Sequence, residues 1–101
     1  MIRYQVSEEA HLDIQEIWDF IARDSFDAAD RHIRKLYDNF ALLSANPGIG
    51  HLRKDLVEDN LLFWPVGAYL ILYRTRPNEI EILAVTQGNR DIPSFLRQRS
   101  L

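Results

Sequence analysis

The sequence predicts an α+β domain in which an antiparallel helical hairpin packs on one face of an antiparallel β-sheet. Two observations predict this class. The first half carries two amphipathic helical patterns, and the second half carries three runs rich in β-branched and aromatic residues. A short N-terminal strand precedes the helices, and a short helix follows the sheet. The 101 residues are 47% hydrophobic and 27% charged, which favours one globular domain over residues 1–101.

A single serine separates the N-terminal strand from the first helix. Residues 1–6 alternate apolar and polar side chains, which is typical of a short strand. Ser7 offers an N-cap before two glutamates, and the helix is expected to end near Arg23. Its apolar stripe is Ala10, Ile14, Ile17, Trp18 and Ile21. The opposite, polar side is predicted to carry most of Asp13, Gln15, Glu16 and Asp19.

A second helix follows after about two or three residues, so the two helices are expected to run antiparallel. Ser25 provides its N-cap, and Pro47 and Gly48 end it because proline cannot continue a helix. Its apolar seam is Ala29, Ile33, Leu36, Phe40 and Leu43. Neither apolar stripe can bury itself completely on the other. Both helices therefore require a further apolar layer.

The second half of the chain supplies that layer. Its apolar runs predict strands at residues 61–66, 68–75 and 80–87. Gly67 and residues 77–79 are suited to the tight turns between them, so the strands are expected to form an antiparallel meander. Pro65 has no N–H to donate and favours an edge or the end of a strand.

The charge distribution argues against binding to nucleic acid. Residues 1–46 hold five basic and nine acidic side chains, a charge of −4, and residues 47–101 hold seven and six, a charge of +1. Nucleic-acid binding needs a basic face that neutralises phosphates, and no overall excess of basic residues is present. We therefore expect no direct, sequence-specific binding to nucleic acid.

Several kinds of site are not expected. The chain has no cysteine, which excludes disulfides and thiolate chemistry and suits a reducing compartment. His11, His32 and His51 are not spaced as metal ligands, so we expect neither a metal nor a cofactor. No uncharged run approaches the roughly 20 residues of a membrane-spanning helix. The sequence predicts a cytoplasmic protein without a membrane partner.

Four blocks of residues, in order along the chain, carry a resemblance to a known family. They are Ala10-x-x-Asp13-Ile14-x-Glu16-Ile17-Trp18-x-x-Ile21-Ala22, Asn46-Pro47-x-x-Gly50-x-x-Arg53, Val66-Gly67-x-Tyr69-x-Ile71-x-Tyr73-Arg74 and Ile80-x-Ile82-x-x-Val85-x-x-Gly88-x-Arg90-Asp91. Together they resemble ParE-type toxins of the ParE/RelE superfamily. The resemblance implies a RelE/ParE-like fold and a toxin of a type II toxin–antitoxin pair. ParE-like members poison DNA gyrase, RelE-like members cleave messenger RNA on the ribosome, and a cognate antitoxin neutralises both.

Gln87 favours the gyrase branch of this resemblance. It stands just before residues 88–91, and many relatives carry histidine at its position. A glutamine side chain cannot exchange protons near neutral pH. We therefore predict a non-enzymatic inhibitor of DNA gyrase, without catalytic residues, neutralised by a ParD-like antitoxin or one of another family. One alternative is a ribosome-dependent ribonuclease that uses His51, Arg53, Arg74 and Arg90. The other is a degenerate toxin that retains only antitoxin binding.

Two binding surfaces are predicted. Large aromatic side chains exceed what a core of this size encloses easily, and exposed aromatics with arginines at the rim suit an antitoxin. The predicted antitoxin-binding residues are Trp18, Phe63, Trp64, Tyr69, Arg74 and Arg76. A C-terminal helix, capped by Asp91, is predicted to bind the target through Arg90, Phe95, Arg97 and Arg99. One alternative is that most of these aromatic residues lie in the core. The others are a solvated strand face, with arginines paired to Glu79 or Glu81, and a fraying tail.

Overall fold

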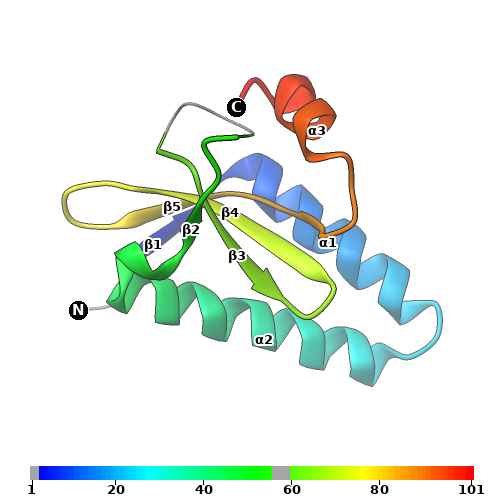
Figure 1. Ribbon diagram of the computed structural model, residues 1–101. Coiled ribbons are helices and arrows are strands. Elements are labelled where there is room, and N and C mark those ends of the chain that lie inside the picture. The colour runs from blue at the N-terminus through cyan, green and yellow to red at the C-terminus, as the bar shows by residue number, and fades with distance from the viewer. Residues whose placement is uncertain (1–2, 56–59) are drawn as a thin grey trace.

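The computed structural model describes residues 3–55 and 60–101. Its elements are β1 (Tyr4–Val6), α1 (Glu8–Ala22), α2 (Phe26–Ala45), a 3-10 turn (Pro47–Ile49), β2 (His51–Leu52), β3 (Leu62–Val66), β4 (Tyr69–Thr75), β5 (Ile80–Gln87) and α3 (Ile92–Arg99). The hairpin of α1 and α2 covers one face of the sheet, and α3 lies against the other face (Figure 1). The predicted class, the helical hairpin, the three-stranded meander and the C-terminal helix are confirmed.

The sheet is mixed, which corrects the prediction of an antiparallel sheet. Its strand order is β1-β5-β4-β3-β2, and β1 pairs with β5 in parallel. Two helices separate β1 from the meander, so no short turn forces these two strands to be antiparallel. The two-residue strand β2 was not predicted, because two residues are too few to show an alternating pattern. It pairs with Leu62 and Phe63 of β3. Farther along β3, Pro65 pairs with Leu70 of β4 and has no partner on the β2 side among the described residues, as predicted for an edge position.

The helix ends follow the predicted caps. The Ser7 hydroxyl accepts a hydrogen bond from the Ala10 N–H at 3.1 Å, and the Ser25 hydroxyl accepts one from Ala28 at 3.1 Å. Most residues of both apolar stripes pack in the core against the sheet, as predicted, whereas Trp18 stacks on Phe26 outside that core. Asp13 departs from the prediction, because it is only 7% exposed and lies on the buried side of α1. Among the described residues, no helix is long and apolar enough to span a bilayer.

Two apolar cores lie on opposite faces of the sheet. The hairpin-side core, between the sheet and α1 and α2, includes the fully buried Leu36, Phe40 and Tyr73. The α3-side core consists of Leu61, Phe63, Leu72, Ala84, Ile92, Phe95 and Leu96. Successive residues of a strand point to opposite faces, which is how three strands serve both cores. Leu83 interrupts this alternation as a bulge, because Leu72 pairs with Ala84 whereas Tyr73 pairs with Ile82.

Tyr73 connects the sheet to the segment after α2. Its hydroxyl donates to the Pro47 carbonyl at 2.8 Å and accepts from the Gly50 N–H at 2.9 Å. A Cβ at position 50 would overlap the Tyr73 ring and hydroxyl, so only glycine fits there. Two of the blocks that carry the family resemblance therefore meet at this contact.

Candidate functional site

The first half of α1 closes an open edge of β5. Strand β1 pairs only with Ile80–Ile82, so the rest of β5 has no neighbouring strand on this side among the described residues. The Asp13 carboxylate accepts a hydrogen bond from the Val85 N–H at 3.0 Å. Ser7 bonds to the next part of the same edge, through its N–H to the Ile82 carbonyl and its hydroxyl to the Leu83 carbonyl. Asp13 of α1 and the N-cap Ser7 thus satisfy backbone groups that could otherwise pair with another strand.

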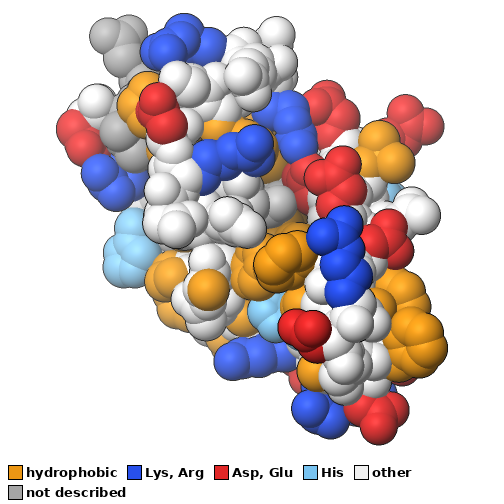
Figure 2. Space-filling model, turned by 90° about the vertical axis from the view of Figure 1, so that its right-hand side faces the viewer, with side chains coloured by type: hydrophobic (Ala, Val, Ile, Leu, Met, Phe, Trp, Pro, Cys, Tyr) orange, Lys and Arg blue, Asp and Glu red, His pale blue; other side chains and the backbone are white. Residues whose placement is uncertain are grey.

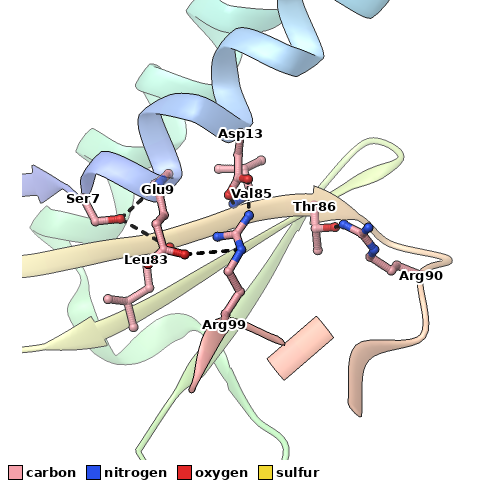
Figure 3. Close-up of polar contacts among 9 residues, drawn as sticks. Ser7, Glu9, Asp13, Leu83, Val85, Thr86, Arg90 and Arg99 are labelled. Atoms are coloured by element: carbon pink, nitrogen blue, oxygen red, sulfur yellow. Dashed lines mark hydrogen bonds and ion pairs between the residues drawn. The ribbon is translucent and has the colours of Figure 1, made fainter. Parts of the chain in front are cut away.

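Arg99 ties α3 to this edge. Its guanidinium pairs with the Asp13 carboxylate and lies 3.4 Å from the Glu9 carboxylate (Figure 3). It also stacks over Phe95, 4.7 Å from the ring centroid, and its side chain is only 21% exposed. Arg90 lies 5.0 Å from the same ring and donates to the Thr86 hydroxyl at 3.2 Å. Arg99, predicted to contact a target, is engaged inside the molecule.

A groove runs beside the second half of α1 and the end of β5. This α1–β5 groove has a volume of about 500 Å³, and it is lined by Glu16, Ile17, Asp19, Phe20, Arg23, Tyr69, Gln87 and Arg90, together with Asp13, Val85 and Thr86 of the closed edge. A second hollow of about 550 Å³ shares Phe20, Tyr69 and Gln87 and extends the groove toward Gly67. Figure 2 views this end of the molecule and shows hydrophobic side chains in a hollow bordered by side chains of both charges.

Comparison with known proteins assigns the family. The family described as "ParE toxin of type II toxin-antitoxin system, parDE" matches residues 4–92. The chain belongs to the ParE toxin family. A solved structure described as "Chromosomal ParDE TA system from P. aeruginosa" contains a chain of the same fold, with a TM-score of 0.70 and 20% identity over 86% of this chain and 96% of that one. No curated protein gives a significant match.

The residues predicted to bind an antitoxin do not form one surface in this ParE-family chain. Tyr69 lines the α1–β5 groove. Trp18 lies outside it, donating to Asp30 at 2.9 Å and stacking on Phe26. Phe63 is 3% exposed within the α3-side core, where no partner can reach it while α3 stays in place.

The remaining antitoxin candidates are engaged within the fold. Trp64 donates to the Asn39 side chain at 3.0 Å and packs against the hairpin-side core. Arg76 pairs with Glu81 at 2.9 Å, the contact expected in the structural alternative for this residue. Arg74 lies opposite Glu81 in the β4–β5 ladder. None of these three lines the α1–β5 groove.

The residues proposed for the ribonuclease alternative lie in different places. His51 and Arg53 line a hollow of about 270 Å³ beside the α3-side core. Asp55 binds Arg53 through two hydrogen bonds of 3.0 and 2.8 Å, which raise the pKa of Arg53 and lower that of Asp55. Arg90 lines the α1–β5 groove instead. Among residues 3–55 and 60–101, no group of three or more His, Cys, Asp or Glu side chains could hold a metal ion.

Sequence reasoning missed Phe20 of the groove and a contact of His32 with Tyr69, which lines the groove. Phe20 is 56% exposed, and it lies off the apolar stripe of α1, a signal that could have identified it. His32 of α2 packs 4.8 Å from the Tyr69 ring, where burial and then the charge of Lys35 lower the pKa of His32. Its helical position alone does not indicate this contact, because Tyr69 is distant in the sequence.

Proposed function

We propose that this member of the ParE toxin family inhibits DNA gyrase by binding it, and that a ParD-like antitoxin neutralises it. Membership of a family described as the toxin of parDE systems supports the proposal. The solved ParDE structure of the same fold agrees with it. On this proposal the toxin acts by occupying its target, makes and breaks no bond, and works in the cytoplasm with gyrase.

The observation that carries the proposal is the dispersal of the ribonuclease candidates. RNA cleavage needs an acid, a base and cations around one phosphate. His51 and Arg53 share one hollow, Arg53 is already paired with Asp55, and Arg90 lines another groove. Gln87, which cannot exchange protons, occupies the position at the end of β5. This arrangement favours binding over phosphate chemistry.

The exposed basic residues near α3 are the proposed contacts with the target. Arg90 and Arg97 are exposed, whereas Arg99 pairs with Asp13 and Phe95 is 3% exposed. Arg97 donates to the Ser94 hydroxyl at 3.0 Å, which keeps its side chain along the helix surface. We assign target contact to Arg90 and Arg97, and positioning of α3 to Phe95 and Arg99.

A supercoiling assay with purified gyrase tests this function. The toxin is expected to inhibit supercoiling, and the double variant R90A/R97A is expected to weaken inhibition about tenfold or more, as loss of paired interface arginines does. R76A is the matched control, because Arg76 is an exposed arginine outside α3 and paired with Glu81. If R76A weakened inhibition as much as R90A/R97A does, the assignment of target contact to Arg90 and Arg97 would be contradicted. Messages cut in a translating extract would establish the ribonuclease alternative instead.

A further inference from the structure

We propose that the α1–β5 groove receives an extended segment of the antitoxin, which pairs with the backbone of β5 and places an apolar side chain beside Phe20 and Tyr69. The inference rests on the antitoxin part of the proposed function and does not depend on gyrase as the target. Three features of the groove support it: free backbone groups, exposed aromatic surface and charges of both signs.

The backbone of β5 offers hydrogen-bonding groups to the groove. The Gly88 N–H bonds to the Ala68 carbonyl of β4 at 2.8 Å. The direction of the backbone N–H and C=O groups alternates along an antiparallel ladder. The backbone groups of Thr86 therefore also point toward β4, whereas those of Val85 and Gln87 point away from it. The bond from the Val85 N–H to Asp13 agrees with this orientation. The Val85 carbonyl and the Gln87 N–H therefore face the groove and can bind an extended peptide.

Aromatic surface lies beside these backbone groups. Phe20 is 56% exposed, and it borders both the groove and its extension together with Tyr69. The side chains of an extended peptide alternate in direction, so one that pairs with β5 directs every second side chain toward this surface. Burial of an apolar side chain against Phe20 would remove exposed apolar area from water, which favours binding.

The charges indicate which segment fits. On the α1 side, Glu16 and Asp19 line the groove together with one basic residue, Arg23, and the acid of Asp13 is already paired with Arg99. Arg90 lines the other side. A complementary segment therefore carries a basic side chain facing Glu16 and Asp19 and a carboxylate facing Arg90. A uniformly acidic segment would be repelled by Glu16 and Asp19.

Calorimetry with the purified antitoxin and two phenylalanine variants tests the inference. F20A is expected to weaken binding about tenfold or more, as removal of a central aromatic anchor does. F26A is the matched control, because Phe26 is 68% exposed but stacks on Trp18 outside the groove. The control is expected to change affinity less than about twofold. Equal weakening by both variants would overturn the proposal.

Amide hydrogen exchange tests the backbone pairing directly. The Gln87 amide of the toxin is expected to gain protection when the antitoxin binds, since it acquires a hydrogen-bond acceptor. Unchanged exchange at Gln87 in the saturated complex would refute strand pairing, even if F20A weakens binding. Unaltered circular dichroism and thermal midpoint of F20A establish that the variant remains folded.

Gyrase inhibition by F20A, measured without antitoxin, separates the two proposals. We expect unchanged inhibition with weakened antitoxin binding. Lost inhibition with unchanged antitoxin affinity would assign the groove to the target and overturn this inference while the toxin function stands. If F20A weakens antitoxin binding but the unmodified toxin does not inhibit gyrase, this inference would stand and the proposed target would be overturned. If the chain dimerises, and F20A abolishes the dimer but leaves antitoxin affinity unchanged, the groove would be assigned to a second copy of this chain.

Discussion

The two faces of the sheet are covered by unequal structures. Two helices of 15 and 20 residues close the hairpin-side core, and Leu36 and Phe40 are completely buried there. A helix of 8 residues closes the α3-side core. That helix also depends on Arg99, which reaches across to Asp13 on α1. One face is held mainly by apolar packing, and the other by a small apolar contact reinforced by an ion pair.

This difference places most of the stability of the fold in one part of the molecule and the proposed target contacts in another. A helix shorter than about 12 residues is marginal by itself, so α3 depends on its tertiary contacts. Elements with few buried contacts open at a lower free energy than the core does. Arg90 and Arg97, the proposed target contacts, therefore belong to the part of the molecule that is easier to release. The following changes test whether the two faces differ in this way.

Replacing one phenylalanine in each core should have the largest effect and the clearest contrast. Phe40→Ala is expected to cost about 3–5 kcal/mol, a large part of the stability of a domain of this size. Phe95→Ala is expected to release α3 while the hairpin-side core stays folded. Urea denaturation and residue-level hydrogen exchange measure both effects. Global unfolding caused equally by both variants would show that the two faces form one cooperative unit.

The next effect concerns the ion pair between α1 and α3. Asp13→Ala leaves the Val85 N–H and Arg99 without their partner, and we expect a loss of about 2–3 kcal/mol, reduced from a fully buried pair because Arg99 is partly exposed. Glu9→Ala is the control, because its side chain is 61% exposed, and it should cost less than about 0.5 kcal/mol. Urea midpoints compare the two. Equal costs would mean that the buried carboxylate has no special role.

Tyr73→Phe should have a smaller effect on the hairpin side. The change removes the hydroxyl that bonds Pro47 and Gly50, and we expect a cost of about 1–2 kcal/mol because the Gly50 N–H loses its acceptor. Urea denaturation provides the measurement, with Tyr37→Phe as the control for removal of a tyrosine hydroxyl. If Tyr73→Phe instead accelerated hydrogen exchange mainly at the amides of α3, the assignment of the Tyr73 hydroxyl to the hairpin side would be contradicted.

Acid should loosen α3 slightly, which is the smallest expected effect. Hydrogen bonds from the Ser94 hydroxyl and then the Ser94 N–H lower the pKa of Asp91, with a further contribution from Arg97. A carboxylate whose pKa is lower in the folded state stabilises the fold above its unfolded value of 3.8, and this contribution is lost as pH falls through the folded pKa. NMR signals of α3 should therefore change below pH 3.8. Asp91→Asn should remove that change, and its persistence would assign the change to another group.

Local patterns were sufficient to predict most elements. Ser7 and Ser25 form the predicted caps, and most residues of the apolar stripes of α1 and α2 face the sheet. The three strands of the meander agree with prediction to within one residue at each end. The two-residue strand β2 and the parallel pairing of β1 were not predictable in this way, because both depend on residues that are distant along the chain.

The candidate site was only partly predictable. Tyr69 and Arg90 do line the groove, but Phe20 was overlooked and Phe63 is covered by α3. A strand's two neighbouring aromatic residues point to opposite faces, so Phe63 and Trp64 could not share one surface. The count of aromatic residues predicted a surplus on the surface, but it could not determine which of them the short helix covers.

The sequence by itself determined the fold class, the helix boundaries and the family, because capping, periodicity and the ordered blocks are recorded in neighbouring residues. Only the tertiary structure decided the roles of Asp13 and Arg99. A helical pattern assigns an aspartate to the solvent side, since an unpaired charge is costly to bury. Here the partners of Asp13 are a backbone N–H 72 residues away and a guanidinium 86 residues away, and the folded chain alone brings them together.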